Sequence, residues 1–176
     1  TYLFYINGWT GINIDACPGS MQAFNKTRKK DINLEIGITN SSEELTYYFI
    51  DKESSMNSFS KDHLQDIGML KLVKKEIPVK TYKLSEVLDK YMPKNQAIDF
   101  LSIDVEGFDK EVLDSNNWGK YRPKVIVIEL HARTLNDVLN NQTTKYLQEL
   151  NYSVWGKTVI LNNISSVIFI DDDYVF

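Results

Sequence analysis

The chain has 176 residues, of which 43% are hydrophobic and 25% are charged, as expected for a globular protein with an ordinary hydrophobic core. Its net charge of −4 argues against a broad phosphate-binding surface, and no apolar stretch approaches the roughly 20 residues of a membrane span. We therefore expect neither nucleic acid nor membrane as a partner. The single cysteine, Cys17, cannot form an internal disulfide, which fits a reducing compartment and predicts a cytoplasmic location.

The first half of the chain alternates short apolar segments with amphipathic ones. A helix is expected from about Ser20, because Met21 and Phe24 recur at helical spacing. The basic run Lys26–Lys30 is expected on the solvated face of that helix. The other segments expected here are strands at Gly11–Asp15 and Ile32–Ile36, a turn at Gly37–Asn40 and an extended piece at Thr46–Ile50.

The polar segment Asp51–Asp66 lacks a clear hydrophobic period and is expected to form a loop. Loops of this length inside a compact domain often carry function. We therefore expect this loop to border a ligand pocket and to be more mobile than its neighbours. A short extended stretch is expected after it, at Val79–Tyr82.

The second half of the chain contains the clearest elements. Apolar residues recur at i, i+3, i+4 and i+7 from Leu84 to Tyr91, which predicts an amphipathic helix that Pro93 ends. The other expected elements are strands at Ile98–Asp104 and Val125–Ile128, buried on both faces, a helix from Phe108 or Asp109, a helix at Leu135–Leu150 interrupted near Asn141, and closing strands at Tyr152–Trp155 and Val167–Ile170.

This order of elements predicts the fold class. Strands that alternate with helices imply right-handed crossovers and a sheet covered on both faces. We therefore predict an α/β protein with a mainly parallel sheet and an antiparallel strand at the C-terminal end. No repeat or second domain is apparent, so residues 1–176 are expected to form one domain.

Three of the expected strands end in acids, namely Asp15, Asp104 and Glu129. Ligands of open α/β sheets bind outside the carboxyl ends of the strands, so these acids are expected at one edge of the sheet. Asp15 can accept hydrogen bonds from both hydroxyls of a ribose. The alternative is that Asp15 caps the helix that follows it.

The segment Asp104-Val-Glu-Gly107 places two carboxylates two residues apart at the end of a buried strand. Gly107 lets a ligand or a chain segment pass close by. Asp104 and Glu106 can bind an ammonium group, a metal ion or an acceptor hydroxyl. The alternative is a strand-to-helix turn whose acids favour the helix N-terminus.

The chain has two histidines, too few for a histidine-based metal cage. His131 lies two residues after Glu129, on the same side of an extended chain. An imidazole titrates near neutral pH, so His131 is a candidate base, and a structural role is the alternative. No activating base is visible for Cys17, which is expected to be a small buried residue.

Three segments, taken in order, resemble the FkbM family of methyltransferases. They are Gly8–Pro18, Ile98–Gly107 and Val125–Glu129. The segments Ser54–Ser58 and Val79–Leu84 fit the region that links them, so the resemblance covers nearly the whole chain. It implies a Rossmann-like methyltransferase fold, S-adenosylmethionine as cofactor and methylation of a hydroxyl on a sugar or other small-molecule acceptor.

The resemblance also implies roles for particular residues. Asp15, with the adjoining Ala16, is expected to bind the adenosine ribose, and Gly37 and Ile38 are expected near the adenine. Asp104 is expected near the methionine end of the cofactor. We therefore predict that Asp15, Gly37 and Asp104 converge on one cleft.

Two residues are candidates for the base. By resemblance, Glu106 faces the transferring methyl group or the acceptor. A hydroxyl is a poor nucleophile until its proton leaves, so a base within hydrogen-bond reach is expected, and Glu106 or His131 can serve. No metal is implied by this chemistry.

The family begins with a strand and a Gly-rich loop, whereas Thr1–Gly8 looks like the end of the helix after that loop. The strand is expected between those ending at Asp15 and Asp104. An open gap would leave backbone groups unpaired at ~1–3 kcal/mol each. We therefore expect further residues upstream, ahead of two alternatives: direct pairing of Gly11–Asp15 with Ile98–Asp104, or a strand donated by a partner chain.

Two other functions fit the sequence. One is a non-catalytic binding or assembly module that keeps the methyltransferase fold without the cofactor loop. The other is a magnesium-dependent phosphotransferase in which Asp104 and Glu106 are oxygen ligands.

Overall fold

The computed structural model describes residues 1–52, 54–161 and 163–174. The chain packs into two compact units that alternate along the sequence. The first comprises Thr1–Lys94 and Glu106–Ser115, and the second comprises Asn95–Val105 and Asn116–Phe176. None of the helices among the described residues is long and apolar enough to cross a membrane.

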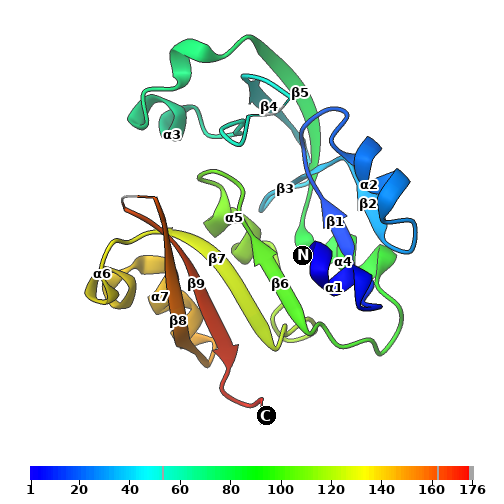
Figure 1. Ribbon diagram of the computed structural model, residues 1–176, viewed down its shortest axis with the longest axis vertical. Coiled ribbons are helices and arrows are strands. Elements are labelled where there is room, and N and C mark those ends of the chain that lie inside the picture. The colour runs from blue at the N-terminus through cyan, green and yellow to red at the C-terminus, as the bar shows by residue number, and fades with distance from the viewer. Residues whose placement is uncertain (53, 162, 175–176) are drawn as a thin grey trace. The chain divides into compact units, whose positions relative to one another are not determined.

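The first unit contains short strands and helices in two small sheets (Figure 1). Strands β1 and β2 pair in parallel, β5 pairs with β3 in parallel, and β5 pairs with β4 antiparallel. The elements are α1 (Tyr2–Ile6), β1 (Ile12–Ile14), α2 (Met21–Thr27), β2 (Ile32–Leu34), β3 (Gly37–Ile38), β4 (Glu44–Phe49), α3 (Lys61–Asp66), the 3-10 turn η1 (Leu70–Leu72), β5 (Lys75–Tyr82), α4 (Leu84–Tyr91) and α5 (Asp109–Asp114).

Helix α4 has the bounds that its hydrophobic period predicts. Its inner face buries Leu84, Val87 and Leu88, each of which stabilises the fold by roughly 1.5–3 kcal/mol. The helix ends at Tyr91, and Met92 after it has an extended backbone with φ −77° and ψ 133°. A residue that precedes a proline is driven out of the helical region, so Pro93 accounts for this end.

Strand β5 begins four residues earlier than the expected stretch at Val79–Tyr82. It contains Pro78, which lies opposite Thr46 of β4. Proline has no N–H to donate, but β3 pairs with β5 only at Thr81 and Tyr82, so the missing donor is not needed on that side. Because proline is rare inside strands, the sequence pattern did not predict the first half of β5.

Three other expectations for the first unit are wrong. The turn expected at Gly37–Asn40 begins with strand β3, because its backbone pairs with β5. The loop expected at Asp51–Asp66 ends in helix α3, which buries Leu64 completely. Glu53 of that segment lies outside the described residues.

The third correction concerns Arg28, which was expected on a solvated helix face but is buried. Its Nε forms an ion pair of 2.7 Å with Asp31 Oδ2. Its guanidinium also lies 5.4 Å from the ring centroids of Tyr5 and Phe24. These contacts satisfy the buried charge, whereas Lys29 and Lys30 are exposed as expected.

The second unit is a four-stranded sheet in the order β6-β7-β9-β8 with two helices (Figure 1). Strands β6 and β7 are parallel, and the pairings of β9 with β7 and with β8 are antiparallel. The elements are β6 (Phe100–Ile103), β7 (Val125–His131), α6 (Leu135–Asn140), α7 (Gln142–Glu149), β8 (Tyr152–Leu161) and β9 (Ile164–Asp171).

The core of this unit lies on one face of the sheet. Alternate residues of β7, namely Ile126, Ile128 and Leu130, are buried, while Val125 and Val127 are only half-buried. In β6, Ile103 is buried and Ser102 is exposed. The expectation that both strands are buried on both faces is therefore wrong, and each follows the alternation of a sheet with one buried face.

The α/β class is confirmed, but a mainly parallel sheet is not. Among the described strands, three pairings are parallel and three are antiparallel. The antiparallel C-terminal strand is present as β9, paired with β7 and β8. Among those same strands, β1 pairs with β2 and β6 pairs with β7. The expectation of further residues upstream stays a prediction. The one-domain expectation stays a prediction.

Candidate functional site

The strongest candidate site in the first unit is built on Glu106 and Gly107. Both have left-handed backbones, with φ of 50° for Glu106 and 92° for Gly107. This region is unfavourable for a residue with a side chain, and strain of this kind persists where surrounding contacts fix it. A Cβ atom on Gly107 would lie 2.8 Å from His63 Cγ, so glycine is required here for both space and conformation.

Glu106 is held from both its backbone and its side chain. The Ser58 hydroxyl donates a hydrogen bond of 2.7 Å to the carbonyl oxygen of Glu106. His63 Nε2 lies 3.7 Å from Glu106 Oε2, and the two side chains are 15% and 16% exposed. The imidazole of His63 and the carboxylate of Glu106 thus face each other in a partly buried site.

The segment that carries His63 is itself anchored. Ser58 Oγ accepts a hydrogen bond of 2.8 Å from the Ser60 N–H, and Ser60 Oγ accepts one of 3.0 Å from the His63 N–H. The second bond caps the N-terminus of α3. Earlier in the segment, Asn57 Oδ1 accepts a bond of 2.7 Å from the Ile50 N–H. The segment is therefore fixed against β4 and Glu106, and its expected mobility stays a prediction.

Asp15 follows β1, and its backbone N–H donates a bond of 3.1 Å to the Leu34 carbonyl. Its Oδ1 accepts a bond of 2.7 Å from the Cys17 N–H, which forms an Asx turn. Helix α2 begins only at Met21, with Ser20 as the N-cap residue, so the alternative that Asp15 caps this helix is wrong. The Asp15 residue is exposed and can accept further hydrogen bonds.

Tyr47 of β4 is buried, and its charged surroundings include Asp15 and Glu106. Burial raises the pKa of the Tyr47 phenol, and the nearby Asp15, Cys17 and Glu106 raise it further. The phenol therefore stays protonated and can act as a hydrogen-bond donor near neutral pH. Burial also raises the pKa of the Cys17 thiol, which is 5% exposed, and this confirms Cys17 as a small buried residue.

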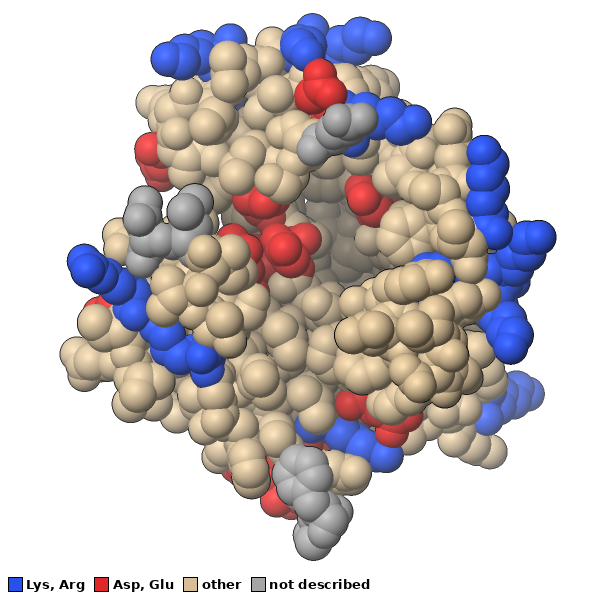
Figure 2. Space-filling view, viewed as in Figure 1, with Lys and Arg blue, Asp and Glu red and all other residues tan. Residues whose placement is uncertain are grey.

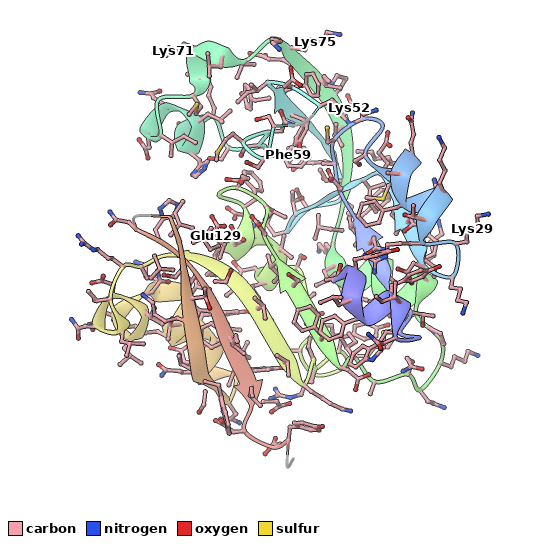
Figure 3. All side chains as sticks on the ribbon, in the orientation of Figure 1. Lys29, Lys52, Phe59, Lys71, Lys75 and Glu129 are labelled. Atoms are coloured by element: carbon pink, nitrogen blue, oxygen red, sulfur yellow. The ribbon has the colours of Figure 1, made fainter. Side chains whose placement is uncertain are left out.

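Gly37 and Ile38 are buried, and the Phe59 ring covers Gly37. A Cβ atom on Gly37 would lie 2.6 Å from Phe59 Cζ and 2.9 Å from Thr81 Cγ2. The Phe59 ring also packs against Tyr47, with ring centroids 4.8 Å apart, and it lies near β4 in Figure 3. In the first unit, Asp15, Glu106 and the Phe59 ring that covers Gly37 therefore all lie near the buried Tyr47.

The second unit holds the other predicted site residues, Asp104 and His131. Ile103 and Ile128 form the last rung of the parallel ladder between β6 and β7, so Asp104 and Glu129 follow at the next position. Glu129 is labelled in Figure 3. The Asp104 residue is exposed, yet partial desolvation of its carboxyl raises its pKa. The convergence of Asp104 with Asp15 and Gly37 on one cleft stays a prediction.

Strand β7 does not end at Glu129 but continues to His131. His131 is exposed at the end of β7, opposite Ile164 of β9. The expectation of a strand end at Glu129 is therefore wrong, because the pairing with β9 extends the strand by two residues.

Basic side chains of the first unit include those of the run Lys26–Lys30 and those near the start of β5. Figure 2 shows them in blue, and Figure 3 labels Lys71 and Lys75 near the start of β5 and Lys29 after α2. Within the described ranges, no group of three or more His, Cys, Asp and Glu side chains is arranged to hold a metal ion. The magnesium-dependent phosphotransferase stays a hypothesis.

Sequence reasoning missed His63. The segment around it was interpreted as an aperiodic loop, so its histidine received no role. A signal was present, because Ser60 precedes Leu64 and Ile67 at the spacing of an N-cap followed by an apolar helical face. That signal predicts a short helix and places His63 in its first turn.

The α/β fold and the acid-rich strand ends are compatible with a class of enzymes that transfer methyl groups. A model of the Methyltransferase FkbM domain matches residues 1–154 of the chain, which therefore belongs to the FkbM methyltransferase family. No curated protein and no solved structure matches the chain. Membership of the family makes the protein a methyltransferase and implies a methyl-donor cofactor.

Proposed function

We propose that the protein transfers the methyl group of S-adenosylmethionine to a hydroxyl oxygen of a carbohydrate or other small-molecule acceptor. The observation that carries this proposal is the placement of Glu106, which has a left-handed backbone and a partly exposed carboxylate facing His63. The proposal includes the Rossmann-like methyltransferase fold, supported by the parallel pairings of β1 with β2 and of β6 with β7. It also includes a cytoplasmic location without nucleic acid or membrane partners.

The transfer is an in-line displacement, in which S-adenosylmethionine supplies an electrophilic methyl carbon. The acceptor oxygen forms the new bond to that carbon, the carbon–sulfur bond breaks, and the acceptor proton must leave. A carboxylate within hydrogen-bond reach of the hydroxyl takes this proton and contributes typically 10²–10⁴-fold in rate. Glu106 is the proposed base, because its backbone carbonyl accepts a hydrogen bond from Ser58 and its carboxylate faces His63 at 3.7 Å.

The residues present fit the proposed cofactor. The exposed Asp15 carboxylate uses one oxygen in the bond to Cys17, and its remaining acceptor capacity suits the two ribose hydroxyls, with Ala16 adjoining. The adenine is proposed next to Gly37 and Ile38, where the Phe59 ring offers an aromatic face. Asp104 is proposed to hold the ammonium group of the methionine end.

Calorimetric titration of the protein with S-adenosylmethionine tests the proposed cofactor. We expect saturable binding of the cofactor. Asp15→Asn should weaken this binding by about 10- to 100-fold, because the variant loses one or two charge-assisted hydrogen bonds. Asp89→Asn, which removes an exposed carboxylate on α4, is the matched control and should bind as the wild type does. Absence of binding at millimolar cofactor would favour the non-catalytic module instead.

A further inference from the structure

His63 makes contacts around Glu106 that a residue of the helix surface would not need. Its ring fills the space beside Gly107, where a Cβ atom would lie 2.8 Å from Cγ and 3.1 Å from Nδ1. Its Nε2 faces the Glu106 carboxylate at 3.7 Å. One side chain therefore contacts both residues of the left-handed pair.

We propose that His63 is the positioning residue for Glu106. The inference rests on the proposed function, because it assigns Glu106 as the base. His63 orients Oε2 of the carboxylate and controls its readiness to take a proton. It does not contact the reacting atoms itself.

The backbone around the pair supports this role. Ser58 Oγ donates to the Glu106 carbonyl and accepts from the Ser60 N–H, and Ser60 caps the turn that carries His63. One chain of hydrogen bonds thus links the backbone of Glu106 to the backbone of His63, and so holds the two side chains near each other. A base must be held in its productive geometry to be effective, and such hydrogen bonds provide this.

The charges around the pair determine how it responds to pH. Asp15, Cys17 and Tyr47 lie in the same surroundings as Glu106, and of these only Asp15 is charged near neutral pH. On α3 itself, Asp62 and Asp66 are exposed neighbours of His63. Asp109 belongs to the segment that follows Gly107. Lys61 of α3 is also exposed, and Lys52 lies near Cys17. The imidazole, when protonated, is the cation that faces the Glu106 carboxylate.

The sign of the pH effect follows from this arrangement. At low pH the imidazolium pairs with the Glu106 carboxylate and makes it a weaker base. As pH rises and the imidazole becomes neutral, the carboxylate gains basicity, so kcat should rise across the range in which a histidine titrates, about pH 6–7.5. Loss of the imidazole should remove this rise.

Two variants test the proposal by kinetics, with methyl transfer from S-adenosylmethionine to a panel of monosaccharides and glycosides as the assay. His63→Gln should lower kcat at pH 7.5 by about 10- to 100-fold, change KM for the cofactor less than 3-fold, and flatten the pH profile. Gln65→Ala, an exposed change on the same helix, should keep both. A pH profile that survives in His63→Gln, or one that is lost in His131→Gln instead, would overturn the proposal.

A second measurement does not depend on activity. The chain has only two histidines, so their imidazole signals can be followed by NMR as pH is varied. Glu106→Gln should lower the titration midpoint of His63 by about 1 pH unit. An unchanged His63 midpoint would refute the pairing even if His63→Gln fails to fold. If the midpoint shifts but no acceptor is methylated, the proposed function fails and the pairing stands.

Discussion

At the scale of single residues, Gly37 and Gly11 differ in whether the surrounding atoms leave room for a side chain. Gly37 is enclosed by Phe59 and Thr81, at 2.6 Å and 2.9 Å from the position of a Cβ atom, whereas Gly11 has no atom within 4 Å of that position. We predict that Gly37→Ala lowers the free energy of unfolding by about 1–3 kcal/mol, because the added methyl group overpacks the site. Denaturant unfolding measures this change.

Gly11→Ala is the matched control for this prediction. Its backbone φ lies outside the left-handed region, so the alanine should be tolerated with no loss of stability. Equal unfolding midpoints for the two variants would show that the Phe59 ring does not pack on Gly37 as described.

Asp104 provides a test by pH. Desolvation raises the pKa of its carboxyl, so the folded protein holds this proton more tightly than the unfolded chain does. Stability from this group is therefore present at low pH and is lost as pH rises from about 3.9, the ordinary value, through the raised value. We predict that Asp104→Asn raises Tm at pH 7 but leaves it nearly unchanged at pH 3.5.

The control for Asp104 is Asp172→Asn, an exposed change after β9. It should leave Tm nearly unchanged at both pH values. A gain in Tm from Asp104→Asn that is equally large at pH 3.5 would mean that the cause is not the charge.

At the scale of elements, the break between α6 and α7 is set by Asn141. Its backbone is extended, with ψ 141°, and its Oδ1 accepts a hydrogen bond of 2.8 Å from the Thr143 N–H. We predict that Asn141→Ala lowers the free energy of unfolding by about 1 kcal/mol, since the first turn of α7 loses its cap. Asn136→Ala, an exposed change within α6, should be neutral in the same denaturant titration.

Elements with a strong local period could be predicted from the sequence. Helix α4 and the interruption at Asn141 follow from residues that lie close together in the chain. Strand β3 and the first half of β5 could not be predicted, because partners distant in the sequence define them and Pro78 obscures the pattern. Helix α3 has only six residues, too few for its period to stand out.

In the candidate site too, some residues could be predicted from the sequence and others could not. The two acids of Asp104-Val-Glu-Gly107 and the acid after β1 are visible in the sequence, because each follows an apolar strand. The contact between His63 and Glu106 joins residues 43 positions apart and depends on a left-handed backbone that no pattern announces. Sequence therefore indicated the base but not its partner.

At the scale of the whole molecule, the chain forms two compact units, and each unit is built from two separate segments of the sequence. It passes between them after Lys94, after Val105 and after Ser115. The second of these crossings separates Asp104 from Glu106, so the two acids of one short motif belong to different units. The chemistry proposed for Glu106 rests on the first unit alone, through Ser58 and His63.

The central claim is that Glu106 is the base of a methyl transfer to a hydroxyl. It is tested most directly with S-adenosylmethionine carrying a radiolabelled methyl group, incubated with sugars and with deoxy analogues that lack one hydroxyl. We predict that the wild type labels an acceptor but not its deoxy analogue, and that Glu106→Gln binds the cofactor normally yet transfers the label about 100-fold more slowly. Labelling by Glu106→Gln at the wild-type rate, or cofactor binding by the wild type without transfer to any hydroxyl, would contradict the account.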